Sequence, residues 1–196
     1  MSVDALRARF SSGHILRDPV KADALVSAVQ EPTKAAVLVP IVLRAAEPTI
    51  LLTRRTAHLS DHAGQISFPG GRVEPEDIGP IATALRETVE EVGLGIQHIE
   101  ILGMLPEYQT GTGYRVTPVV GLVNPPFDLA PDTFEVAEIF EIPLGFFMNP
   151  ENHQIHERVI GGRTRRYYAM PYLNYYVWGA TAAMLVNLYR FLSETA

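Results

Sequence analysis

The most constraining feature of the chain is a short acidic segment downstream of a glycine turn. The turn Phe68-Pro69-Gly70-Gly71 precedes the run Arg86-Glu87-Thr88-Val89-Glu90-Glu91-Val92-Gly93-Leu94. At about 100° per residue, one arc of a helix through this segment carries Ile81, Ala84, Leu85, Thr88, Val89 and Val92. The opposite arc carries Glu87, Glu90 and Glu91. The pattern predicts a helix that packs by one face and presents three carboxylates on the other.

Three carboxylates on one helix face favour a metal site over a merely solvated surface. Glu87 lies three and four residues before Glu90 and Glu91, and like charges at these spacings destabilise a helix unless a cation offsets them. Arg86 is the cation nearest to them in the sequence. Carboxylate oxygens suit Mg²⁺ or Mn²⁺, which keep several waters and share their remaining positions with substrate phosphates. An ordinary solvated acidic face is the alternative.

The same residues resemble the motif of a known family. Gly71, Asp77 and the run from Arg86 to Leu94 resemble the Nudix box, written G-x5-E-x7-R-E-U-x-E-E-x-G-U with U apolar. Two positions depart from it, since Asp77 replaces a glutamate and lies one residue farther from the Arg-Glu pair, and Thr88 occupies an apolar position. The resemblance implies an α/β fold, an α/β/α sandwich around a mixed β-sheet, and metal-dependent hydrolysis of a nucleoside diphosphate derivative.

A second segment resembles one subfamily. Residues 51–71 are similar to the signature of Nudix coenzyme A pyrophosphatases, commonly L-L-T-x-R-S/A-x3-R-x3-G-x3-F-P-G-G. The departures are Thr56 at the Ser/Ala position and Ser60 where the family usually carries arginine, a residue that pairs well with phosphate. Residues 135–144 and 178–182 also look like that subfamily.

This resemblance implies a small-molecule, coenzyme A-like nucleotide substrate. The products would be 3′,5′-ADP and 4′-phosphopantetheine or its acyl form. Because Ser60 cannot supply the cation of the usual arginine, a Nudix hydrolase of ADP-ribose or another nucleoside diphosphate derivative remains an alternative. A rival from another class is a Nudix domain that senses a nucleotide without cleaving it, and the intact glutamate cluster disfavours that reading.

The residues of the expected site divide into three roles. We assign Glu87, Glu90 and Glu91 to metal ligation, with one of them also serving as the base, and the resemblance adds the Gly71 carbonyl as a ligand. Arg86 would orient Glu87 or meet a phosphate, with a structural ion pair as an equal alternative, and Glu135 would be a further acid from a later segment or a solvated side chain. The expected substrate-binding residues are Arg54, Arg55, Ser60, Gly70 and Gly71. Neighbours on a strand point to opposite sides, so only one of the two arginines is expected to face phosphate.

Composition limits the class of protein. At 196 residues, with 47% hydrophobic and 19% charged residues, we expect a single Nudix domain over residues 1–196 with a helical extension over about residues 1–32. No apolar run approaches the roughly 20 residues of a membrane span. The net charge of −6 argues against broad nucleic-acid binding, because phosphate contacts need clustered Lys and Arg. Without cysteine or a secretory signal, a cytoplasmic location is the expectation, and a homodimer is compatible with the sequence.

Periodicity and turn residues place the remaining elements. Helices are expected over residues 3–10, 20–29, 144–148 and 180–192, and the acidic helix should start at Gly79-Pro80 and end at Gly93. Strands are expected over residues 35–43, 66–68, 99–105 and 115–123, and one ending near Thr53. A hairpin is expected from residues 155–160 and 163–170 around Gly161-Gly162.

Overall fold

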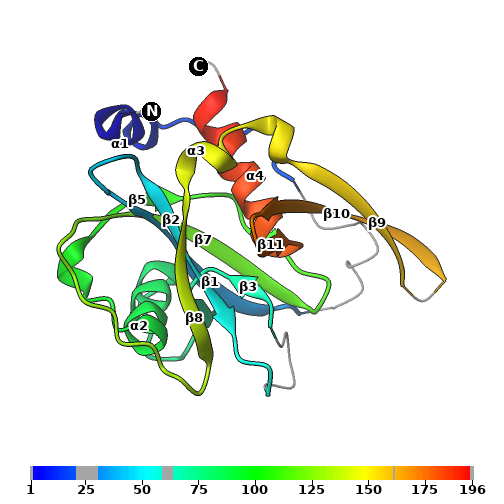
Figure 1. Cartoon of the computed structure of the whole chain (residues 1–196), viewed down its shortest axis with the longest axis horizontal. Helices are drawn as coiled ribbons and strands as arrows, with labels where there is room; N and C mark the ends of the chain where they lie inside the picture. The colour runs from blue at the N-terminus through cyan, green and yellow to red at the C-terminus, as the bar shows by residue number, and fades with distance from the viewer. Residues whose placement is uncertain (1, 21–30, 59–63, 161, 195–196) are drawn as a thin grey trace.

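A computed structural model of the chain describes residues 2–20, 31–58, 64–160 and 162–194. Its helices are α1 (Val3–Ser11), α2 (Pro80–Val92), α3 (Leu144–Phe147) and α4 (Ala180–Ser193), with 3-10 helices η2 (Ile96–His98) and η3 (Pro150–Asn152) (Figure 1). Its strands are β1 (Thr33–Val42), β2 (Thr49–Arg55), β3 (Ile66–Ser67), β4 (Gly70–Arg72), β5 (Ile99–Met104), β6 (Tyr108–Gln109), β7 (Tyr114–Val123), β8 (Val136–Pro143), β9 (Gln154–Ile160), β10 (Arg163–Tyr172) and β11 (Tyr175–Trp178). Apart from Val20, the helix predicted over residues 20–29 lies outside the described residues.

The main sheet is mixed, as predicted. Its strands run in the order β3-β2-β1-β7-β5, with β4 paired to β1, β6 to β7 and β8 to β2. β1 and β7 are parallel along their whole length, from Thr33 opposite Tyr114 to Val42 opposite Val123. The other pairs of this sheet are antiparallel, so β1 lies at the centre with a parallel neighbour on one side and antiparallel ones on the other.

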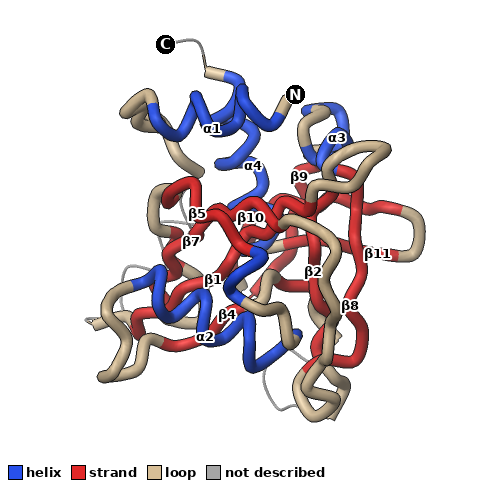
Figure 2. The backbone as a smooth tube through the Cα atoms, turned by 90° about the vertical axis from the view of Figure 1, so that its left-hand side faces the viewer, coloured by secondary structure: helices blue, strands red, loops and turns tan. Residues whose placement is uncertain are grey.

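Helices cover both faces of this sheet, which makes the three layers of an α/β/α sandwich (Figure 2). Strand residues alternate between the faces: Ala36 and Leu38 of β1 pack with Ala84 of α2, while Val39 and Ile41 join the larger core that includes α4. Burial of apolar side chains on both faces holds the layers together. The predicted α/β architecture is confirmed.

A second, three-stranded antiparallel sheet packs beside α4 in the order β11-β10-β9. The hairpin of β9 and β10 was predicted, and its register pairs Arg163 with Ile160 and Ala169 with Gln154. β11 was not predicted, because its residues, Tyr-Tyr-Val-Trp, are few and uninterrupted by polar ones. Its Val177 and Met170 of β10 are fully buried in the larger core.

The N-terminal helix α1 is fastened to the end of the chain and to the sheet. Arg9 Nε donates to the carbonyl of Phe191 in α4 at 2.6 Å, and the rings of Phe10 and Phe191 lie 4.6 Å apart. Arg7 forms a two-pronged pair with Glu100 of β5, with both N···O distances at 2.8 Å. None of the helices in the described part of the chain is long and apolar enough to cross a membrane.

Candidate active site

The glycine turn brings the backbone of β4 against the acidic helix. Gly70 has a φ of +153° and a β-carbon there would overlap the backbone of Ala36 and Val37, so this close approach needs glycine. A β-carbon on Gly71 would overlap the carboxylate of Glu87. The predicted turn residues therefore lie directly beside the first of the three glutamates.

The acidic helix has the predicted limits but a different buried face. It begins with Pro80 after Gly79 and ends at Gly93, whose N–H donates to the carbonyl of Val89. Ile81 and Val89, expected to pack, are 37% and 43% exposed, whereas Glu91, expected on the outer arc, is only 6% exposed. The predicted packing face was wrong at these three positions. Glu91 can be buried because Gly70 and Arg55 provide polar partners for its carboxylate.

Glu91 is a buried carboxylate with two partners from other segments. Its Oε2 accepts a hydrogen bond from Gly70 N at 3.1 Å, and its Oε1 lies 3.6 Å from Arg55 Nη1. Burial raises the pKa of Glu91 to about 7; the Gly70 N–H and Arg55 lower it, and Glu87 and Glu135 raise it again. Burial likewise raises the pKa of Glu87, and Arg86 opposes that effect. Glu87, Glu91 and Glu135 form one electrostatic cluster, because Glu135 raises the pKa values of both Glu87 and Glu91.

Arg86 connects the helix carboxylates to the preceding loop. Its Nη1 donates to Glu87 Oε1 and to Glu90 Oε2, both at 3.0 Å. Its Nε and Nη2 donate to the two oxygens of Asp77 at 3.1 and 2.9 Å. The pKa of Asp77 lies well below its usual range, first because of the hydrogen bonds from Arg86. Asp77 had no predicted role in the site, although its place in the box motif marked it, and it fixes the arginine that bridges two of the glutamates.

Thr88, which occupies a motif position that is usually apolar, is buried, and its hydroxyl is hydrogen-bonded. Its Oγ1 donates to the Ala84 carbonyl one turn earlier at 2.6 Å. A threonine therefore replaces an apolar residue here because the helix backbone itself accepts its hydrogen bond.

Of the two neighbouring arginines of β2, only Arg55 reaches carboxylates of the acidic cluster. Its Nη2 lies 3.5 Å from Glu135 Oε2, in addition to the contact with Glu91. Arg54 points to the opposite face, where its guanidinium lies 3.5 Å from Glu138 and 5.3 Å from the ring centre of Tyr175. Ser60 lies outside the described residues.

The donor chemistry of the cluster fits a divalent metal. Glu87, Glu90, Glu91 and Glu135 supply hard oxygens, and their close charges require a cation. In the described part of the chain, no three carboxylate or imidazole groups are already gathered closely enough to hold a metal. Arg86 lies between Glu87 and Glu90 and neutralises them in this arrangement.

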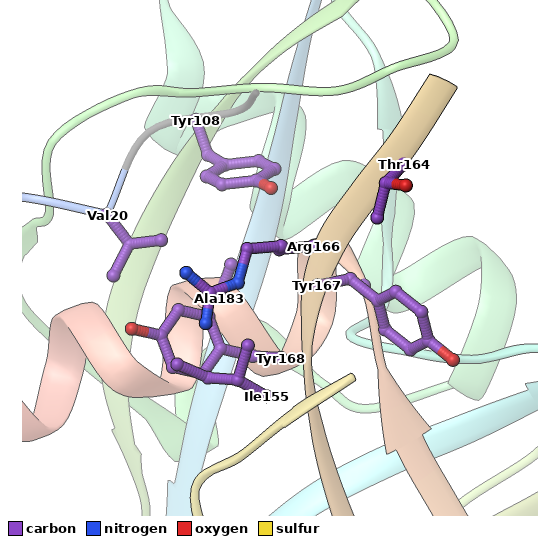
Figure 3. A pocket seen from close by; sticks show the side chains of 9 residues that line it. Val20, Tyr108, Ile155, Thr164, Arg166, Tyr167, Tyr168 and Ala183 are labelled. Carbon is purple, nitrogen blue, oxygen red and sulfur yellow. The ribbon is translucent and has the colours of Figure 1, made fainter. Parts of the chain in front are cut away.

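A cavity of about 370 Å³ lies elsewhere, between β6, β10 and α4 (Figure 3). Its lining includes Tyr108, Arg166, Tyr168 and Ala183, and none of the carboxylates of the cluster. The candidate active site is therefore the acidic cluster at the glycine turn and not this cavity.

The acidic, arginine-bridged cluster at the glycine turn of the α/β/α sandwich is thus the candidate active site, and comparison with known proteins gives its class. A family model, the NUDIX domain, matches residues 32–157. The chain belongs to the Nudix family, and it is accordingly a Nudix hydrolase, a pyrophosphohydrolase of nucleoside diphosphate derivatives that works with a divalent metal ion.

Two relatives agree with the family assignment, and a solved structure resembles the fold. "Uncharacterized Nudix hydrolase NudL" of Photorhabdus laumondii is 43% identical over 154 residues, covering 79% of this chain and 82% of that protein. The protein of the same name from Yersinia enterocolitica is 44% identical, covering 79% of this chain and 78% of its own length. The fold resembles that of a Nudix hydrolase from M. smegmatis, RenU, with a TM-score of 0.50 at 22% identity, covering 59% of this chain and 73% of that one.

Proposed function

We propose that the protein hydrolyses coenzyme A or acyl-coenzyme A to 3′,5′-ADP and (acyl-)4′-phosphopantetheine, using Mg²⁺ or Mn²⁺. The subfamily signature over residues 51–71 supports the substrate. The observation that carries the proposal is the position of Arg55 of that signature, 3.6 Å from Glu91 of the acidic helix. The arginine provides a positive charge for the diphosphate, and the carboxylates provide the ligands for its metal ion.

In this proposal Glu87, Glu90 and Glu91, with the Gly71 carbonyl, hold the metal. A bound divalent cation neutralises diphosphate oxygens and lowers the pKa of a coordinated water. Arg86, held by its hydrogen bonds to Asp77, orients the carboxylates of Glu87 and Glu90. The Gly70 N–H orients the carboxylate of Glu91.

Arg55 and Glu135 complete the proposed site beside Glu91. Arg55 would bind a substrate phosphate while also limiting repulsion between Glu91 and Glu135. Glu135, which comes from the segment before β8, is an acid outside the helix that can accept the proton of the attacking water. One of the helix glutamates is the other candidate for that base.

We further propose one domain over residues 1–196, with the first 32 residues as an extension of the Nudix core, located in the cytoplasm. Residues 32–157, which match the family model, exclude α1, β10, β11 and α4. The contacts of Arg9 and Phe10 with Phe191 join the two ends of the chain outside the matched region.

The test is hydrolysis of a nucleotide panel containing coenzyme A, acetyl-coenzyme A, dephospho-coenzyme A and ADP-ribose, with products identified by mass. We expect 3′,5′-ADP and 4′-phosphopantetheine from coenzyme A, loss of activity with a chelator, and recovery with Mg²⁺ or Mn²⁺. Cleavage of ADP-ribose without cleavage of coenzyme A would redirect the substrate assignment. Tight binding of a nucleotide without any product would favour a sensing role.

Ser60→Arg tests the departure from the subfamily signature. If the usual arginine binds the 3′-phosphate, the variant should lower KM for coenzyme A and change it less for dephospho-coenzyme A, which lacks that phosphate. A charge-assisted hydrogen bond contributes about 1.5 to 3 kcal/mol, or roughly one to two orders of magnitude in affinity. Equal effects on both substrates would contradict this reading of position 60.

A further inference from the structure

Phe134 is an exposed aromatic side chain next to the acidic cluster. The residue is 65% exposed, whereas phenylalanine side chains are ordinarily buried. Its ring meets the ring of His58 edge to face, with centroids 4.9 Å apart and an angle of 61° between the planes. His58 follows β2 and Phe134 precedes β8, so the rings come from the two segments that also supply Arg55 and Glu135.

The segment that carries Phe134 is firmly attached to the site. Thr56 Oγ1 donates to the Phe134 carbonyl at 2.8 Å, and Phe134 N donates to Asp132 Oδ1 at 2.9 Å. Asp132 N in turn donates to the Glu91 carbonyl at 2.9 Å. The backbone of Phe134 is therefore held by Thr56, the residue after β2, and through Asp132 by the turn of α2 that carries the buried carboxylate. Thr56, a departure from the subfamily signature, makes one of these attachments.

Phe134 is the immediate neighbour in sequence of Glu135, a member of the acidic cluster. Consecutive α-carbons are about 3.8 Å apart, and Glu135, the next residue, lies 3.5 Å from Arg55. Phe134 therefore borders the cluster at which the proposed substrate diphosphate binds. An exposed π face at that place is the chemistry that recognises a nucleobase, because every base presents a flat aromatic face for stacking.

We propose that Phe134, braced by His58, is the stacking platform for the nucleobase of the substrate. This rests on the proposed function, since the base must belong to a nucleoside diphosphate derivative whose diphosphate binds at the cluster. Stacking does not depend on the hydrogen-bonding edge of the base. Phe134 therefore sets the affinity for nucleoside substrates as a class, and other groups choose between adenine and another base.

Phe134→Leu removes the π face while keeping an apolar side chain, and Phe134→Trp keeps the face. The substrates are coenzyme A and an abasic analogue in which hydrogen replaces the adenine. Stacking on an aromatic side chain corresponds to roughly five-fold to 100-fold in affinity. Phe134→Leu should raise KM for coenzyme A by this factor and leave KM for the abasic analogue unchanged, whereas Phe134→Trp should stay near wild type on both. An equal rise for both substrates, or no rise for either, would overturn the platform.

Phe127→Leu is the control, because Phe127 contacts Arg44 and His98 and packs against the apolar cluster that includes Val42 and Leu51. It should change neither KM. Calorimetric binding of 3′,5′-ADP in the presence of Mg²⁺ gives a readout that needs no hydrolysis. If coenzyme A is not cleaved but Phe134→Leu weakens 3′,5′-ADP binding, the substrate proposal fails and the platform stands. If coenzyme A is cleaved and both proteins bind 3′,5′-ADP equally, the platform alone fails.

Discussion

Glu91→Gln should make the metal-free protein more stable while it removes activity. Glu91 is 6% exposed, and burial raises the pKa of its carboxyl from the ordinary 4.5 to about 7. The folded protein therefore disfavours the charge that metal binding needs. Glutamine has nearly the same shape, can still accept the Gly70 N–H bond, and carries no charge to bury.

The size of the effect follows from the pKa. Because the pKa is raised in the folded state, the folded protein binds more protons than the unfolded chain between about pH 4.5 and 7, so stability falls as pH rises through this range. Each pKa unit corresponds to 1.36 kcal/mol, and the full cost above pH 7 is about 3 kcal/mol. Glutamine has no such cost, so the unfolding free energy of the variant should exceed that of wild type by up to this amount at pH 8. At pH 4.5 the two unfolding free energies should be almost equal.

The assay is urea unfolding in a chelator at pH values from 4.5 to 8.5. Glu90→Gln is the control, because that side chain is 58% exposed and its pairing with Arg86 should contribute only about 0 to 1 kcal/mol. Saturating Mg²⁺ should stabilise wild type and have less effect on Glu91→Gln, since the variant binds the metal more weakly. Unfolding free energies of wild type and Glu91→Gln that run parallel across the pH range would refute the argument that this charge is buried at a cost.

Three further predictions concern other groups. Asp77→Asn removes the negative charge and one of the two oxygens that accept hydrogen bonds from Arg86, and it should lower kcat and raise the Mg²⁺ concentration needed for half-maximal rate; unchanged Mg²⁺ dependence would contradict this role. Burial lowers the pKa of His153 below its ordinary value, so the stability it contributes is lost as pH falls below about 6.5; His153→Gln should flatten the fall in stability between pH 7 and 5, and an unchanged slope would argue against it. Thr181→Val loses a buried hydrogen bond of 3.0 Å to the Ile66 carbonyl, which should lower the unfolding free energy by about 1 to 3 kcal/mol in urea titrations; an unchanged midpoint would show that the bond contributes nothing.

The sheet and the acidic helix could be predicted because their signals are local. The apolar residues of β1 and β7 alternate between two covered faces, and a strand buried on both faces is apolar throughout. Pro80 and Gly93 marked the ends of α2 by chemistry that depends only on their own backbone. β11 was missed because four residues give too short a pattern to identify a strand.

The inner structure of the site was less accessible to sequence reasoning. Helical periodicity placed Glu91 with the outer carboxylates, and its burial depends on Gly70 and Arg55, which come from distant parts of the chain. Alternation along β2 predicted that Arg54 and Arg55 diverge, but not which of them faces the carboxylates. That choice depends on the pairing of β2 with β8, which places Arg54 opposite Glu138.

The most direct test of the account is Mn²⁺ binding, measured by electron paramagnetic resonance, together with turnover in the same samples. Wild type should bind Mn²⁺, and Glu87→Gln and Glu91→Gln should each weaken binding and lower kcat by orders of magnitude while the protein stays folded. Chelator should abolish turnover in wild type. Wild-type Mn²⁺ affinity and wild-type turnover in both variants would contradict the claim that these carboxylates form the metal site of the enzyme.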